Sequence, residues 1–224
     1  MELEGKVINF LGDSITEGIG VTNRLQNRFD NIIKRECGLR AVNNYGVGGS
    51  RIAYQSKPSE NPRYDLYFCG RAITMDPHAD IVVVYGGVND YLHGDASMGA
   101  FGDKTPQTFY GGLYFLMDHL KKQYEGKTVI FVTPAHCNFY TGTDRAPSNH
   151  PYKPKDSYPL ERYVAAIREM ANYFELPVLD FYNDLGVDPN RPEDAEKYTT
   201  DGLHFNNNGH AVIAQKMKEF LSSL

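Results

Sequence analysis

The segment Lys6-Val-Ile-Asn-Phe-Leu11, followed by Gly12-Asp13-Ser14-Ile15-Thr16-Glu17-Gly18, decides how the rest of this chain is interpreted. The apolar run predicts a strand, and the glycines on either side of the polar residues predict a turn. The strand would deliver Ser14 to an exposed turn at the edge of a sheet, which is where open α/β folds place their chemistry. Because Asp and Ser are also common turn and capping residues, Ser14 alone does not establish a reactive site.

A second polar segment, Asp201-Gly202-Leu203-His204, offers what a reactive serine needs. A serine hydroxyl is a weak nucleophile until a base removes its proton. An Asp three residues before a His, across a glycine turn, can accept a hydrogen bond from one ring nitrogen while the other nitrogen faces outward. We therefore assign His204 as the candidate base and Asp201 as the group that orients it. Asp13 competes for the orienting role, but we expect it to bond backbone amides in its own turn.

Two clusters of small and polar residues follow strand-like runs between these segments. They are Asn44-Tyr-Gly46-Val-Gly48-Gly49-Ser50 and Gly86-Gly87-Val-Asn89-Asp90. Charge developing on a carbonyl oxygen needs fixed donors, and the natural set is the Ser14 amide, the Gly49 amide and the Asn89 side-chain amide. A glycine at position 49 also lets the backbone approach a substrate closely. The alternative for these residues is an ordinary strand-exit turn.

Taken together, the four segments resemble the motif blocks of the SGNH hydrolases, also called the GDSL esterase/lipase family. The blocks occur in the family's order, and the resemblance covers nearly the whole chain. Phe205 departs from the pattern, since the family often has proline after the histidine, and this leaves the local wall of the pocket in question. The resemblance implies the flavodoxin-like strand order 2-1-3-4-5. It also implies hydrolysis of short acyl esters, such as O-acetyl groups on carbohydrates or small metabolites.

These residues predict a serine esterase that forms an acyl-enzyme on Ser14 and then transfers the acyl group to water. The predicted catalytic residues are Ser14, Asp201 and His204, and the predicted oxyanion hole consists of Ser14, Gly49 and Asn89. We expect no metal and no cofactor. Two alternatives stay open: a thioesterase or acyltransferase with the same residues, and a non-catalytic carbohydrate-binding relative. The complete residue set argues against the binding relative, whereas the natural ester and its acyl length are not encoded in the motifs.

Composition limits the class of protein. The 224 residues, 41% of them hydrophobic, predict one globular domain, 1–224, with a substantial core. A formal net charge of −5 without a basic block argues against nucleic acid and anionic membrane surfaces as partners. No stretch is long enough to span a membrane, so we expect no membrane insertion and a small-molecule ester as the partner. The acidic N-terminus favours a cytoplasmic location. Cys37, Cys69 and Cys137 lack Cys-x-x-Cys spacing, which is typical of reduced, buried thiols. The oligomeric state is left open.

The pattern along the chain predicts a three-layer α/β/α sandwich with a five-stranded parallel sheet. Near-continuous apolar runs indicate strands buried on both faces, expected at 6–11, 41–45, 80–85, 127–133 and 177–181. Helical spacing predicts helices from Asn23 through Cys37, over 107–124, over 160–174 and over 207–222. Thr22 or Asn23 would cap the first helix, with Leu25 on its apolar side. An Asn from 206–208 would cap the last.

Two stretches, 51–62 and 134–159, read as irregular loops at the rim of the site. His136 and Cys137, in the second stretch, are candidates for shaping the acyl pocket. Four tyrosines in or beside these loops could stack on a sugar, although ordinary loop packing is the stronger interpretation: Tyr54, Tyr64, Tyr140 and Tyr152. Five histidines are read as surface or packing residues: His78, His93, His119, His150 and His210.

Overall fold

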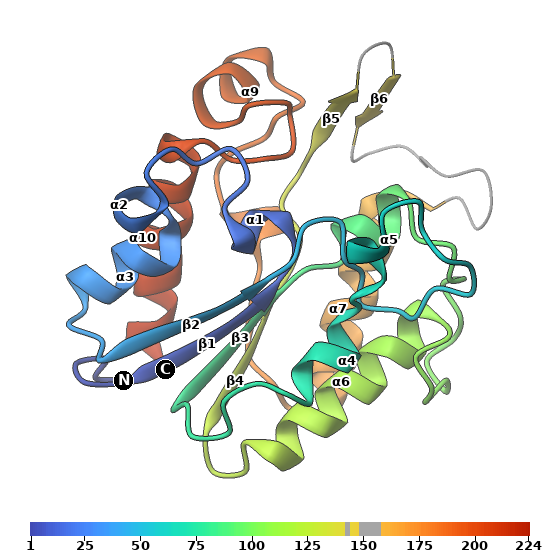
Figure 1. The fold of residues 1–224 in the computed structure, drawn as a ribbon, viewed down its shortest axis with the longest axis horizontal. Helices are drawn as coiled ribbons and strands as arrows, with labels where there is room; N and C mark the ends of the chain where they lie inside the picture. The colour runs from blue at the N-terminus through green and yellow to red at the C-terminus, as the bar shows by residue number, and fades with distance from the viewer. Residues whose placement is uncertain (142–143, 148–157) are drawn as a thin grey trace.

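The computed structural model describes residues 1–141, 144–147 and 158–224. Its central sheet contains the parallel strands β1 (Val7–Gly12), β2 (Ala41–Gly46), β3 (Ile81–Tyr85), β4 (Thr128–Val132) and β7 (Val178–Leu179). Their order is β2-β1-β3-β4-β7 (Figure 1). This confirms the five-stranded parallel sheet and the flavodoxin-like order predicted from the sequence.

Helices cover both faces of the sheet (Figure 1). α3 (Phe29–Glu36) and α10 (Asn207–Ser223) pack on one face. α4 (Phe68–Ala72), α6 (Phe109–Gln123) and α7 (Leu160–Tyr173) pack on the other. Because successive side chains of a strand point to opposite faces, β3 sends Val82 and Val84 into one hydrophobic core and Ile81, Val83 and Tyr85 into the other. That double burial explains why the strand reads as a continuous apolar run.

The edge strands differ from the sequence prediction. β2 is half-buried along its whole length, so the prediction that every strand is buried on both faces was wrong for it. Among the strands that the structure describes, β2 pairs only with β1, and it carries Asn43 and Asn44. The Asn44 side chain donates to the Thr16 carbonyl (2.8 Å) and to Asp30 (2.9 Å). The last strand, β7, is only two residues long.

The first predicted helix is two helices, α2 (Arg24–Asn27) and α3, separated at Arg28. Arg28 has an extended backbone, with ψ at 136°, and its guanidinium pairs with Asp30 at 2.7 and 2.8 Å. Leu25 is 82% exposed rather than packed, and Asn23 makes no side-chain cap. At the other end of the chain, Asn206 caps α10 by accepting from the amides of residues 208 and 209, as predicted.

Short elements cluster at the carboxyl ends of the strands. They are α1 (Ser14–Glu17), the 3₁₀ turn η1 (Pro62–Asp65), α5 (Val88–Leu92), α8 (Phe181–Asp184) and α9 (Pro192–Tyr198). The stretch expected to be irregular after β4 contains an antiparallel hairpin of β5 (Asn138–Thr141) and β6 (Asp144–Pro147). Residues 142–143 and 148–157 of that stretch, which include His150 and Tyr152, lie outside the described residues.

Two further features of the fold concern membrane-spanning helices and disulfide bonds. Within the described residues, no helix combines the length and apolar character needed to cross a bilayer. Cys69 and Cys137 are buried, as predicted, whereas Cys37 is only half-buried. No disulfide joins these three cysteines, all of which lie in the described part of the chain.

Candidate active site

Ser14 is the first residue of α1, and only Asp13 separates it from the carboxyl end of β1. Asp13 is the N-cap of this short helix, and its Oδ1 accepts from the Ile15 amide at 3.0 Å. This is the backbone role expected for Asp13. The side chain of Ser14 is less accessible than predicted, since only 4% of the residue is exposed. Its hydroxyl therefore faces a cavity rather than open solvent.

The structure brings His204 and Asp201 to Ser14 across 190 residues of sequence. His204 Nε2 lies 3.0 Å from Ser14 Oγ, and Nδ1 lies 2.6 Å from Asp201 Oδ2. Because a carboxylate only accepts, Nδ1 holds the ring proton, and Nε2 is left to accept the serine proton. Asp201 Oδ1 also accepts from the amides of Leu203 (3.1 Å) and His204 (2.7 Å), so the turn itself fixes the carboxylate.

The predicted oxyanion donors converge on the same place. Asn89 lies in α5, just beyond β3, and its Nδ2 donates to the Ser50 carbonyl at 3.0 Å, which leaves a second N–H. Gly49 has φ of +72°, and a Cβ there would lie 2.1 Å from the Tyr64 ring, so only glycine fits. Among the described residues, nothing accepts a hydrogen bond from the Ser14 or Gly49 amide.

Comparison with known proteins shows which family the chain resembles. The model of the GDSL-like lipase/acylhydrolase family matches residues 10–212. The chain belongs to this family. Membership supports a hydrolase that acts on ester bonds. No curated protein matches the chain.

Solved structures resemble the chain over nearly its full length. A protein from Lactobacillus plantarum is 31% identical, with a TM-score of 0.84, over 99% of this chain and 98% of that one. A lipase/acylhydrolase from Enterococcus faecalis is 19% identical, with a TM-score of 0.63, over 97% and 96%. The acetyl xylan esterase AlAXEase is 23% identical, with a TM-score of 0.62, over 95% and 98%. At these identities the last two show the fold alone.

The pKa values of the two carboxyl groups near His204, Asp201 and Asp13, are shifted in opposite directions. Burial alone would raise the pKa of Asp201, but hydrogen bonds from the His204 ring and from two backbone amides hold it below its ordinary value. Burial raises the pKa of Asp13 to about 6, although the Ile15 amide and the charges of His204 and Arg71 act in the other direction. Asp201 is therefore the carboxylate that stays ionised at neutral and mildly acid pH.

A cavity of about 390 Å³ opens over Ser14 and His204. Apolar side chains and polar side chains both line it. The apolar ones are Ile19, Leu92, Phe139 and Leu203, and the polar ones beyond the predicted site are Glu17, Asn61, Arg63, Tyr64 and His93. Glu17 accepts from the Gly48 amide (2.7 Å) and pairs with Arg63 (2.9 Å), so this ion pair joins α1 to η1.

Several residues expected at the rim lie elsewhere. Phe205, which left the pocket wall in question, is buried in the core shared with α10 and does not line the Ser14 cavity, so it does not contribute to that wall. His136 packs against Tyr182 with ring centroids 4.0 Å apart, and Cys137 is buried; neither lines the cavity. Tyr64 does line it, whereas Tyr54 does not. The side chains of Tyr140 and Tyr152 lie outside the described part of the structure.

Sequence reasoning missed Glu17, Phe139 and His93. Glu17 stands three residues after Ser14 within the same motif, and His93 stands four residues after Asn89, a spacing that aligns side chains on one face of a helix. Those two spacings could have identified both residues. Phe139 sits edge-on to the His204 ring at 6.0 Å and comes from β5, which had no sequence signal. Of the other histidines, His210 is buried against Phe29, as expected for a packing residue.

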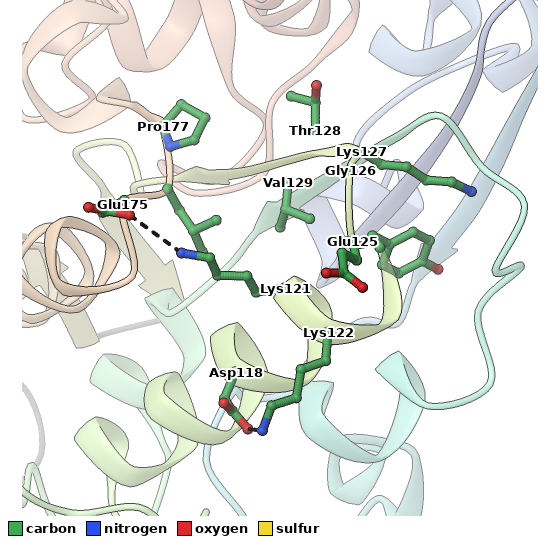
Figure 2. A pocket seen from close by; sticks show the side chains of 12 residues that line it. Asp118, Lys121, Lys122, Glu125, Gly126, Lys127, Thr128, Val129, Glu175 and Pro177 are labelled. Carbon is green, nitrogen blue, oxygen red and sulfur yellow. Dashed lines mark hydrogen bonds and ion pairs between the residues drawn. The ribbon is translucent and has the colours of Figure 1, made fainter.

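A larger hollow, about 620 Å³, lies where α6 leads into β4 (Figure 2). It is at the amino ends of β4 and β7, whereas Ser14 lies beyond the carboxyl end of β1. Lys122 pairs with Asp118 at 2.7 Å, and Lys121 faces Glu175 at 3.8 Å. Its lining contains neither serine nor histidine. Within the described residues, no group of three or more His, Cys, Asp or Glu is placed to hold a metal ion.

Proposed function

We propose that this protein is a serine esterase that hydrolyses short-chain acyl esters, in particular O-acetyl esters of carbohydrates or other small metabolites. The observation that carries the proposal is the hydrogen-bonded series Asp201–His204–Ser14, which ends in a cavity of about 390 Å³. Family membership supports ester hydrolysis, and the side chains around the cavity support the kind of ester.

In the first half-reaction, Ser14 Oγ attacks the ester carbonyl carbon while His204 Nε2 takes the serine proton. The carbonyl π electrons move onto oxygen, and the tetrahedral intermediate carries its negative charge there. His204 then gives the proton to the leaving alcohol, and the acyl group remains on Ser14. Asp201 stabilises the imidazolium without taking a proton itself, in keeping with its lowered pKa.

In the second half-reaction, water takes the place of the alcohol. His204 Nε2 removes a proton from the water, which attacks the acyl carbonyl, and the same nitrogen returns that proton to Ser14 Oγ. In both halves the negative oxygen is met by the amides of Ser14 and Gly49 and by the free N–H of Asn89. Each such donor acts in a site that already holds it in position, so no reorganisation is needed when the charge appears.

The lining of the cavity supports a small acyl group and a polar alcohol. Its volume is near the lower end of the roughly 300–1,000 Å³ that small-molecule sites occupy. Leu92, Phe139 and Leu203 offer an apolar surface for an acyl chain. Asn61, Arg63 and Glu17 offer donors and acceptors for hydroxyl groups on the leaving alcohol. The AlAXEase likeness contributes only the fold to this argument.

The test combines a substrate screen with covalent labelling. p-Nitrophenyl acetate, butyrate and octanoate are assayed beside acetylated sugars with the wild type, Ser14→Ala and the control Ser222→Ala, which changes an exposed serine on α10. We expect a preference for acetate, loss of activity only in Ser14→Ala, and a single organophosphonate adduct that maps to Ser14. Inhibition without an adduct, or an adduct on another serine, would overturn the acyl-enzyme assignment, and a preference for octanoate would overturn the substrate class.

A further inference from the structure

We propose that His93 is a positioning residue for the oxyanion hole: it links the buried guanidinium of Arg51 to the side-chain amide of Asn89 and fixes which way that amide faces. The inference rests on the proposed esterase function. His93 is the residue directly after α5, one helical turn beyond Asn89, and its ring lines the Ser14 cavity.

Hydrogen-bond chemistry assigns the proton on the His93 ring. Arg51 is only 3% exposed, and its Nη1 lies 3.1 Å from His93 Nδ1. A guanidinium group has donors and no acceptor, so Nδ1 must accept and cannot hold a proton. The ring proton is therefore on Nε2, which lies 3.1 Å from Asn89 Oδ1 and donates to it.

The far side of the Asn89 amide gives the same orientation independently. Nδ2 donates to the Ser50 carbonyl at 3.0 Å, and a carbonyl oxygen only accepts. Rotating the amide by half a turn would set Oδ1 against the Ser50 oxygen and Nδ2 against the proton of His93. With the amide held at both ends, the second N–H of Nδ2 is the group left for a substrate oxygen.

The other end of the linkage is anchored in the loop that forms the cavity wall. Arg51 Nη2 donates to Asp65 (2.9 Å), to Ser59 Oγ (2.8 Å) and to the Tyr64 carbonyl (3.1 Å). The Tyr64 ring packs against the His93 ring with centroids 5.5 Å apart. A buried cation that donates into a chain of two hydrogen bonds polarises each donor along it. Arg51 thus strengthens the Asn89 N–H at the moment when negative charge develops on the substrate.

Two substitutions separate this linkage from simple packing. His93→Gln offers one acceptor and one donor in a single amide, so it can still join Arg51 to Asn89. His93→Phe keeps a ring beside Tyr64 but neither accepts nor donates. We expect His93→Phe to lower kcat by about 10-fold with KM unchanged, a smaller loss than the ~10²–10³ for removal of the donor itself. His93→Gln should recover most of that loss, and the control His78→Phe, at an exposed site, should match the wild type.

A double-mutant cycle tests whether His93 acts through Asn89. In the Asn89→Ala background, His93→Phe should cause no further fall in kcat, because the group that it positions is gone. An equal fall in both backgrounds, a rise in KM alone, or a glutamine variant no better than phenylalanine would overturn the proposal.

A measurement on the resting protein keeps this inference separate from the esterase assignment. ¹⁵N NMR of histidine-labelled wild type at neutral pH, with the His93 signal assigned by its loss in His93→Gln, should show a proton on Nε2 and none on Nδ1. Signals of an Nδ1–H ring or of a doubly protonated ring would overturn the linkage. If the wild type lacks Ser14-dependent hydrolysis while the Nε2–H ring is found, the proposed function fails and the positioning of Asn89 stands.

Discussion

Replacing Asp13 with asparagine removes a buried negative charge and keeps the side-chain oxygen that caps α1. Asp13 is 2% exposed, and its Oδ1 accepts from the Ile15 amide, a bond that asparagine can also make. Burial raises the pKa of this carboxyl from 3.8 to about 6, against the lowering effects of that hydrogen bond and of the charges on His204 and Arg71. The native state therefore works against the charged form of Asp13.

The sign and size of the effect follow from linkage between protonation and folding. Between about pH 4 and pH 6 the folded protein binds more protons at Asp13 than the unfolded chain does, so stability falls as pH rises through this window. A shift of this size corresponds to roughly 3 kcal/mol. The gain in unfolding free energy from Asp13→Asn should therefore be larger at pH 7.5 than at pH 4, by up to ~3 kcal/mol.

Urea unfolding followed by circular dichroism measures this difference, and the slope with urea checks that both proteins unfold in the same way. Circular dichroism is used because the chain contains no tryptophan whose fluorescence could report unfolding. Asp201→Asn is the matched control with the opposite sign. Its carboxyl has a lowered pKa in the fold, so it contributes stability above the unfolded pKa that is lost as pH falls. A stability difference between Asp13→Asn and wild type that stays constant from pH 4 to 7.5 would refute the reasoning.

Three further changes test the donor set and the chemistry. Asn89→Ala should lower kcat by about 10²–10³ with KM little changed, whereas an unchanged kcat with a raised KM in steady-state kinetics would make Asn89 a ground-state contact. Gly49→Ala should lower the free energy of unfolding by at least ~1 kcal/mol and also lower kcat, because φ of +72° strains an L residue and the new Cβ meets the Tyr64 ring. Thermal unfolding measures the loss, and a variant as stable as the wild type would contradict the inference that only glycine fits at position 49. EDTA should leave hydrolysis unchanged, and inhibition that zinc or manganese restores would contradict a metal-free mechanism.

The sheet and the ends of its strands were predictable from sequence because their physical causes are local. Residues 81–85 are apolar throughout, since both faces of β3 are covered by helices. Glycine and short polar side chains follow because the chain must turn sharply where the strand ends. Ser14, Gly49 and Asn89 could be placed at one edge for this reason, since parallel strands end on the same side of the sheet.

The remainder depends on contacts between distant segments. The break at Arg28 follows from its pairing with Asp30, and helical spacing alone gives no sign of it. The hairpin of β5 and β6 carries Phe139 to the His204 ring, although its sequence reads as an irregular loop. Arg51 and His93 are 42 residues apart, and each looks like an ordinary surface residue until the fold brings them to 3.1 Å.

The structure also favours Asp201 over Asp13 as the carboxylate that supports His204 in the proposed mechanism. A carboxylate that stabilises an imidazolium must stay charged over the working pH range. Asp201 meets this requirement, because three hydrogen bonds at 2.6, 2.7 and 3.1 Å hold its pKa below the ordinary value. Asp13 does not, since its pKa of about 6 leaves it partly protonated in mildly acid solution. Environments that push two neighbouring pKa values apart assign different roles to the same chemical group. In the proposed mechanism Asp201 is thus the partner of the base, whereas Asp13 is the cap that shapes the turn holding Ser14.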